Sequence, residues 1–168
     1  MISRSRGYLP HLEIPQGTYL VTFRLEDSLP ANLLIHWKKE LQHQKNLKDA
    51  SSELDREYRG KIETYLDTNS GRCWLNNPKI AGFVVCALRF FDGQRYILHT
   101  WTVMPNHVHV LFTTSGSWNL SSIVHSWKSY TANKANHLLS CSGRFWQPEY
   151  FDQLIKSERQ FQFAVRTF

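Results

Sequence analysis

Apolar and polar residues alternate along three stretches of the chain. In Gly17–Leu25 apolar side chains fall on every second position, which predicts a strand with one buried face. Two further strands are predicted at Tyr96–Met104 and His107–Thr114, joined by the short link Pro105-Asn106. Because so short a link leaves no room for a crossover, these two strands are expected to be antiparallel neighbours.

Apolar residues recur at helical spacing in the segments between and after these strands. Helices are predicted to open near Asp27–Pro30 and to cover Glu53–Leu66, Pro78–Phe91, Leu120–Leu139 and a last segment from Ser157. Phe145–Leu154 is expected to be irregular or extended. The last helix keeps its apolar spacing to the final residue without a C-cap signal, so the chain is expected to end inside an element. The mixture predicts a single α+β domain, residues 1–168, with antiparallel strands and helices packed on one face.

Composition narrows the class of protein. With 42% hydrophobic and 20% charged residues among 168, the chain is not expected to be disordered. It contains no apolar run of about 18 residues and no apolar core behind its basic N-terminus, so neither a membrane span nor a secretory signal is expected. Cys73, Cys86 and Cys141 form no CxxC pair, which favours a reducing cytoplasm over disulfides or structural zinc.

The net charge of +6 is concentrated in the second half of the chain. Residues 95–168 hold seven basic and three acidic side chains, interleaved with aromatic residues. This pattern suits single-stranded nucleic acid, although a basic soluble surface accounts for it equally well. The candidates for phosphate contacts are Arg24, Lys128, Lys134, Arg144 and Lys156, and the candidates for base stacking are Trp146 and Tyr150.

His107-Val108-His109 is the strongest candidate for chemistry. On a strand, positions i and i+2 face the same side, so two imidazoles beside a turn are able to hold a divalent ion while Val108 points into the core. The chain has eight histidines, and one H-x-H among them is close to the chance expectation. On this pattern alone, a pair of surface histidines remains the alternative.

Three blocks of the sequence carry a family resemblance. RYILHTWTVMPNHVHVLF, IVHSWKSYTANKAN and GRFWQPEYFDQLIKSERQF occur in this order, and the chain resembles the REP-associated tyrosine transposases, relatives of the single-tyrosine HUH transposases of the IS200-like kind. The resemblance extends to TYLVTFRLEDSLP and CWLNNPKIAGFVVCALRFFDGQRY and so covers essentially the whole chain. It implies a ferredoxin-like sheet on which His107 and His109 bind Mg²⁺ or Mn²⁺. It further implies that this ion polarises a phosphate of single-stranded DNA at hairpin ends, and that a helical tyrosine attacks the phosphate to form a 5′-phosphotyrosine.

The chain departs from the family pattern at that tyrosine, whose position falls on Thr167, with Phe168 after it. An alkanol is far less acidic than a phenol, so Thr167 is a poor substitute. Tyr150 and Tyr130 are weak candidates for the nucleophile. Three readings stay open: a transposase that nicks and joins DNA, a domesticated module that binds hairpin DNA without chemistry, and a nuclease using metal-activated water. The last needs a carboxylate that the sequence does not place, and whether two chains form a homodimer is also open.

Overall fold

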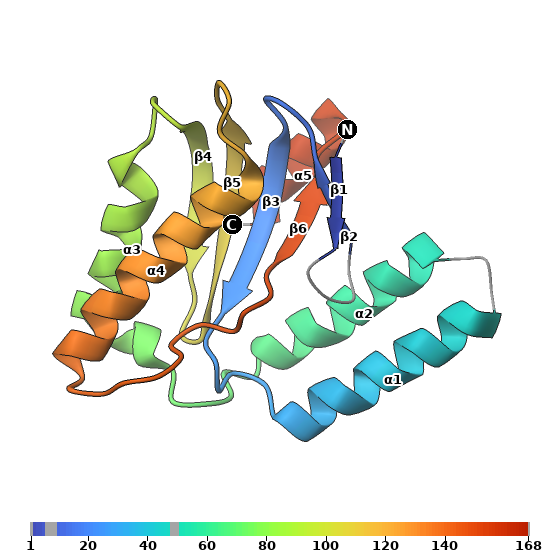
Figure 1. Ribbon diagram of the computed structural model, residues 1–168, viewed down its shortest axis with the longest axis horizontal. Helices are drawn as coiled ribbons and strands as arrows, with labels where there is room; N and C mark the ends of the chain where they lie inside the picture. The colour runs from blue at the N-terminus through green and yellow to red at the C-terminus, as the bar shows by residue number, and fades with distance from the viewer. Residues whose placement is uncertain (1, 6–9, 48–50, 168) are drawn as a thin grey trace.

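The computed structural model describes residues 2–5, 10–47 and 51–167 (Figure 1). A four-stranded sheet consists of β3 (Thr18–Arg24), β4 (Tyr96–Val103), β5 (His107–Thr114) and β6 (Phe151–Leu154). The helices are α1 (Ala31–Leu47), α2 (Ser51–Leu66), α3 (Pro78–Phe90), α4 (Leu120–Leu138) and α5 (Glu158–Thr167), with a short 3₁₀ turn, η1 (Trp74–Asn76), before α3. A separate two-stranded sheet pairs β1 (Ile2–Ser5) with β2 (Pro10–Glu13).

The strand order of the main sheet is β4-β5-β3-β6, and all neighbours are antiparallel. Along the chain the order is strand, helices, two strands, helix, strand, which is the ferredoxin-like arrangement. The α+β, ferredoxin-like prediction is therefore confirmed. β5 lies in the middle of the sheet, so any side chain that it carries is held by neighbours on both sides.

One face of the sheet carries the main hydrophobic core. Tyr19, Val21 and Phe23 of β3 lie opposite Phe112, Val110 and Val108 of β5, and α3 and α4 pack over them. In this core Trp127 of α4 stacks on Phe23, and its indole N–H donates to the hydroxyl of Tyr96. The prediction that helices pack on one face of the sheet holds for α3 and α4.

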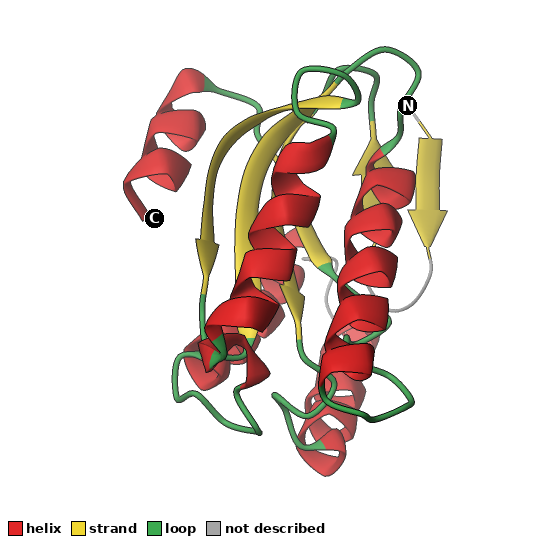
Figure 2. Cartoon of the chain, turned by 90° about the vertical axis from the view of Figure 1, so that its left-hand side faces the viewer, coloured by secondary structure: helices red, strands yellow, loops and turns green. Residues whose placement is uncertain are grey.

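The other face is covered differently. α5 lies on the side of the sheet away from α3 and α4 (Figure 2), and Tyr58 of α2 packs against Phe151 of β6. Leu111 of β5 points to this side and is fully buried, so this face also needs a cover. Helices on both faces are thus a refinement of the sequence prediction, and the space between this face, α2 and α5 is where the polar side chains of β3 and β5 point.

Candidate metal and DNA site

The central strands bring the two candidate histidines together. His107 and His109 lie two positions apart on β5, opposite Arg24 and Thr22 of β3, while Val108 is buried in the core on the opposite face. Their imidazole rings are 4.7 Å apart between centroids, and the two Nε2 atoms are 3.0 Å apart. The predicted arrangement of two imidazoles on one face is what the structure shows.

A neighbouring amide fixes the tautomer of His107. The side-chain nitrogen of Asn106 donates to the carbonyls of Leu66 and Ser70, so its Oδ1 atom faces His107 at 2.7 Å from Nδ1. Since that oxygen only accepts, Nδ1 of His107 carries the proton, and Nε2 presents a lone pair toward His109. This is the outer-shell hydrogen bond that orients metal-binding histidines in proteins.

His109 has a similar partner, the hydroxyl of Thr22, which lies 2.7 Å from its Nδ1 atom. A hydroxyl both donates and accepts, so His109 is able to adopt either tautomer. Without a cation, its Nε2–H donates to His107. With a cation between the rings, Nδ1 donates to Thr22 and both Nε2 lone pairs become available. The pair can therefore switch to a ligand pair by moving one proton.

Burial keeps both rings uncharged at neutral pH. Desolvation, together with the neighbouring His109, lowers the pKa of His107 to about 3. Desolvation lowers the pKa of His109 to about 4, although the charge of Asp67 acts in the opposite direction. Since a metal binds only the neutral imidazole, protons do not compete for this pair near pH 7.

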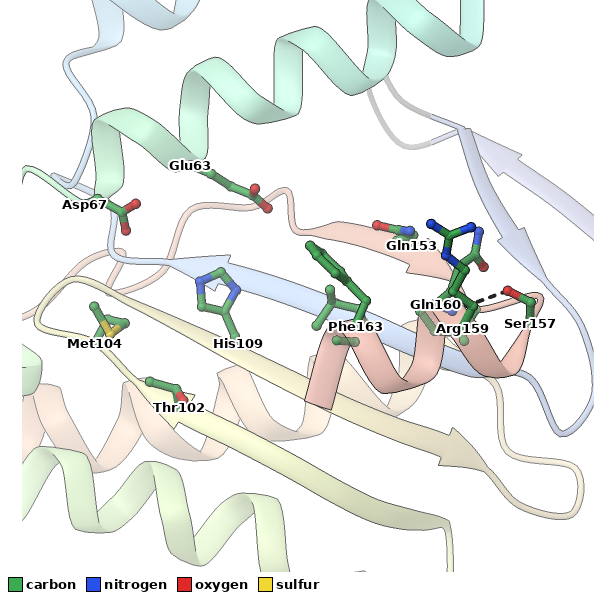
Figure 3. A pocket seen from close by; sticks show the side chains of 13 residues that line it. Glu63, Asp67, Thr102, Met104, His109, Gln153, Ser157, Arg159, Gln160 and Phe163 are labelled. Carbon is green, nitrogen blue, oxygen red and sulfur yellow. Dashed lines mark hydrogen bonds between the residues drawn. The ribbon is translucent and has the colours of Figure 1, made fainter. Parts of the chain in front are cut away.

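A cavity of about 700 Å³ opens beside His109, between the sheet, α2 and α5 (Figure 3). Two carboxylates line it, Glu63 in the last turn of α2 and Asp67 directly after that helix, and Phe163 of α5 points into it (Figure 3). Burial, followed by the charge of Asp67, raises the pKa of Glu63, although Arg59 opposes the shift. The sequence analysis placed no carboxylate at the site, so these two side chains are functional candidates that it missed.

The pair fits a divalent cation. Two nitrogens bound at adjacent corners of an octahedron, each about 2.1 Å from the ion, are about 3.0 Å apart, which is the separation of the two Nε2 atoms. In the described part of the chain no cluster of three or more His, Cys, Asp or Glu side chains forms a complete metal site. Two imidazoles supply nitrogen only, so the oxygen ligands that Mg²⁺ or Mn²⁺ prefers would come from water, from a phosphate, or from the carboxylates in the cavity.

The candidate nucleophiles do not lie at this site. Tyr130 is 44% exposed on α4, and Tyr150 packs beside the main core with Lys128 6.0 Å from its ring centroid. Neither residue lines the cavity beside His109. Thr167 is the last residue of α5, and Phe168 lies outside the described residues. The aromatic side chain that does enter the cavity belongs to Phe163, which has no hydroxyl.

Two of the predicted DNA contacts belong to side chains that are buried in the structure. Arg24 is 2% exposed on β3 beneath the cover of α2. Trp146 is 5% exposed, and its indole N–H donates to the hydroxyl of Thr131 inside the core. Lys128 is half-buried and donates to two backbone carbonyls, those of Gln147 and Pro148.

The remaining predicted contacts are on the surface but are not gathered in one place. Lys134 lies near the C-terminal end of α4, and Arg144 lies in the exposed loop after that helix. Lys156 follows β6 and faces α2 across a groove. The seven residues thus do not form one interface, and of them Arg24, opposite His107 on β3, lies beside the histidine pair.

Comparison with known families gives a match over part of the chain. Residues 86–162, less than half of the chain but including β4, β5 and α4, match the family described as transposase IS200-like. Over this stretch the chain is similar to the IS200-like transposases, which agrees with the resemblance seen in the sequence.

Two solved structures are similar over nearly the whole chain. One is a REP-associated tyrosine transposase bound to a REP hairpin, with 16% identity and a TM-score of 0.49, covering 98% of this chain and 68% of that one. The other is a candidate transposase from Deinococcus radiodurans R1, with 14% identity and a TM-score of 0.37, covering 99% and 95%. Neither similarity by itself fixes the function of this chain. A search of curated proteins finds no match.

Within residues 2–5, 10–47 and 51–167, no helix is long and apolar enough to cross a bilayer.

Proposed function

We propose that residues 1–168 act as one DNA-binding domain that holds a hairpin-ended single strand of DNA with a phosphate beside His107 and His109. The observation that supports this most directly is the facing pair of Nε2 atoms, 3.0 Å apart, with Nδ1 of each ring already hydrogen-bonded elsewhere. The family match over residues 86–162 supports a role in transposition chemistry. The hairpin-bound relative supports the choice of DNA substrate.

The residues of this chain would hold a divalent cation, Mg²⁺ or Mn²⁺, through the two imidazoles. Such an ion would supply charge stabilisation to the oxygens of a phosphate. His107 and His109 bind it, while Asn106 and Thr22 orient the rings. Glu63 and Asp67 add negative charge in the same cavity, which favours a cation there and repels DNA phosphate when no cation is present.

We further propose that this chain binds DNA without forming the family's phosphotyrosine. A phenol is needed within reach of the phosphate, and the residues lining the cavity include no tyrosine. α5, the helix beside the histidines, reads ERQFQFAVRT and also lacks one. The non-catalytic hairpin-binding module is therefore favoured over the nicking enzyme. The hypothesis of a metal-dependent nuclease ranks second, because Glu63 and Asp67 supply the carboxylate that the sequence did not place.

The test uses a labelled hairpin with a single-stranded extension, in Mn²⁺ or in EDTA. We expect binding that Mn²⁺ strengthens, no covalent adduct on a denaturing gel, and no cleaved strand. His109→Ala should abolish the effect of Mn²⁺, whereas His125→Ala, which changes an exposed histidine on α4, should not. An adduct that survives denaturation would sink the non-cleaving proposal. A cleaved strand without an adduct would favour the nuclease, and absence of DNA binding would overturn both.

Thr167→Tyr sharpens the same test, because it adds a phenol at the position that the family resemblance assigns to the nucleophile. We expect this variant to form an Mn²⁺-dependent adduct with the strand, and the adduct should disappear when His109→Ala is added. The covalent adduct is measured as a band of lower mobility on a denaturing gel. If Thr167→Tyr binds the hairpin normally and forms no adduct, more than the phenol has been lost from the site.

A further inference from the structure

A second cavity of about 460 Å³ adjoins the one beside His109. It lies between α2 and β6, and the two cavities share the side chains of Glu63 and Gln153. The family match begins at residue 86 and does not include α2. The wall that α2 provides is therefore a feature of this chain that the family match does not describe.

Basic side chains line this second cavity, which we call the α2–β6 groove. Arg56 and Arg59 come from α2, and Lys156 comes from the segment after β6. Arg159 of α5 lines the adjoining cavity beside His109. Arg56 and Lys156 are exposed, and in the described part of the chain neither side chain is ion-paired with a carboxylate. The basic residues thus follow a path along the groove toward the histidines.

The acidic side chains of the groove offset this charge only in part. Asp55 is paired with Lys45 of α1, with 2.6 Å between Oδ1 and Nζ. Asp152 is 5% exposed. Glu63 lies where the two cavities meet, and its pKa is raised by burial. The cations that remain accessible in the groove, Arg56 and Lys156, face solvent without such partners.

Arg59 provides an independent sign that an anion belongs here. Its Nη1 atom donates to the backbone carbonyl of Asp152 at 2.5 Å, which holds the guanidinium against β6. Its Nε atom is buried, and among the described residues no acceptor lies within hydrogen-bonding distance of it. Leaving such a donor unsatisfied is unfavourable, so an acceptor supplied by a ligand is favoured.

We propose that the α2–β6 groove receives the phosphate backbone of the single-stranded part of the DNA and leads it to His109. The inference rests on the proposed function and adds where the strand runs. Basic side chains that track a strand, without base-specific contacts, are how proteins bind single-stranded DNA regardless of sequence. Arg56, Arg59 and Lys156 would contact successive phosphates before the strand reaches the histidine pair.

Gly60 allows a test that leaves the fold intact. It lies on the helical wall of the groove, and a Cβ atom added there meets nothing within 4 Å. Gly60→Glu therefore introduces a negative charge in the groove without a clash, and Gly60→Ala is the matched control. We expect Gly60→Glu to bind a hairpin with a single-stranded tail about tenfold more weakly than Gly60→Ala at low salt, with the difference shrinking as salt rises. For a hairpin without a tail, the two variants should bind equally.

A charge-removal pair gives a second readout. Arg56→Ala/Lys156→Ala removes two groove cations, whereas Lys79→Ala/Arg89→Ala removes two exposed cations from α3 on the opposite face of the sheet. The first pair should lower the slope of log affinity against log salt by about 0.7 per lost contact for the tailed hairpin. The second pair should leave the slope unchanged.

The outcomes separate this inference from the proposed function. If the wild-type chain binds the hairpin in an Mn²⁺- and His109-dependent way but Gly60→Glu equals Gly60→Ala, the strand does not run through the groove and only the inference is overturned. Equal slopes for the two double variants would have the same meaning. If the wild-type chain binds no DNA, the proposed function fails and the inference fails with it.

Discussion

The two faces of the main sheet are built from the same strands and have opposite characters. Tyr19, Val21 and Phe23 of β3 are at most 1% exposed beneath α3 and α4. The intervening residues Leu20 and Thr22 share their face with His107 and His109, and Leu20 and His109 line an open cavity. Because successive side chains of a strand point to opposite sides, one alternating sequence encodes both a packed core and a polar site. The apolar positions therefore build the core, and the positions between them build the candidate site.

The largest effect is expected on the packed face. Trp127 is 1% exposed, contacts the rings of Phe23 and Phe112, and donates to Tyr96. Trp127→Ala leaves a large cavity and should lower the free energy of unfolding by about 3–5 kcal/mol, as measured by urea denaturation. If the variant unfolds at the same urea concentration as the wild type, α4 does not contribute to the core as described.

The strands and helices that form the core were also the elements whose bounds were predicted most accurately from the sequence. β5 has the predicted bounds His107–Thr114; β4, α3 and α4 each end one residue earlier than predicted, and β3 is one residue shorter at each end. Period-2 and helical patterns identify elements that bury one face, and these elements do so. β6 falls within the segment expected to be irregular or extended. The hairpin of β1 and β2 was not predicted, because ISRS and PHLE lack an alternating apolar pattern.

The site was predictable only where its residues are close in sequence. The spacing of His107 and His109 places both on one face of one strand, and the structure agrees. Glu63 and Asp67 are some forty residues earlier, and nothing in the sequence indicates that the end of α2 meets the sheet beside them. Counting basic and aromatic residues selected Arg24 and Trp146, which are buried, for a related reason. Composition does not report burial, and both side chains are enclosed by segments distant in the chain.

The next effect is a dependence of stability on pH that originates on the polar face. An unfolded chain protonates its histidines near pH 6.5, whereas in the folded protein the pKa values of His107 and His109 are about 3 and 4. Between these values the unfolded state binds more protons, so the free energy of unfolding falls as the pH drops below 6.5. Each histidine contributes up to about 1.4 kcal/mol per pH unit in this window.

The double variant His107→Asn/His109→Asn isolates this contribution. Urea denaturation at pH 7, 6 and 5 in the presence of a chelator should show a smaller loss of stability on acidification than in the wild type. Carboxylates elsewhere titrate equally in both proteins, so they cancel in the comparison. Parallel pH profiles would show that the two imidazoles are not held neutral by burial.

Substitution of Asn106 is expected to lower stability by a smaller amount and to weaken Mn²⁺ binding markedly. Its side chain donates to Leu66 and Ser70 and accepts from His107, and it is fully buried. Asn106→Ala should cost about 1–3 kcal/mol and weaken Mn²⁺ binding by about 10- to 100-fold, measured by calorimetry.

Asn119→Ala provides the control for Asn106→Ala, because Asn119 caps α4 through its bond from the Ser122 N–H, and its loss costs about 1 kcal/mol. The Asn119 variant should bind Mn²⁺ as the wild type does. If both variants lower the affinity for Mn²⁺ equally, Asn106 acts through the general stability of the fold and not by orienting the ring of His107.

The smallest effect is expected from a change of one hydroxyl beside His109. Thr22 and Thr102 lie opposite His109 on the two neighbouring strands, β3 and β4. Only the Thr22 hydroxyl bonds to the ring, at 2.7 Å from Nδ1, and among the described residues the Thr102 hydroxyl makes no hydrogen bond. Thr22→Val keeps the shape and removes the partner that lets His109 change tautomer, so Mn²⁺ binding should weaken by about tenfold. Thr102→Val should leave it unchanged. Equal Mn²⁺ affinities in the two variants would mean that Mn²⁺ binding does not depend on the tautomer of His109. The positions of the two imidazoles would then be sufficient to bind the cation.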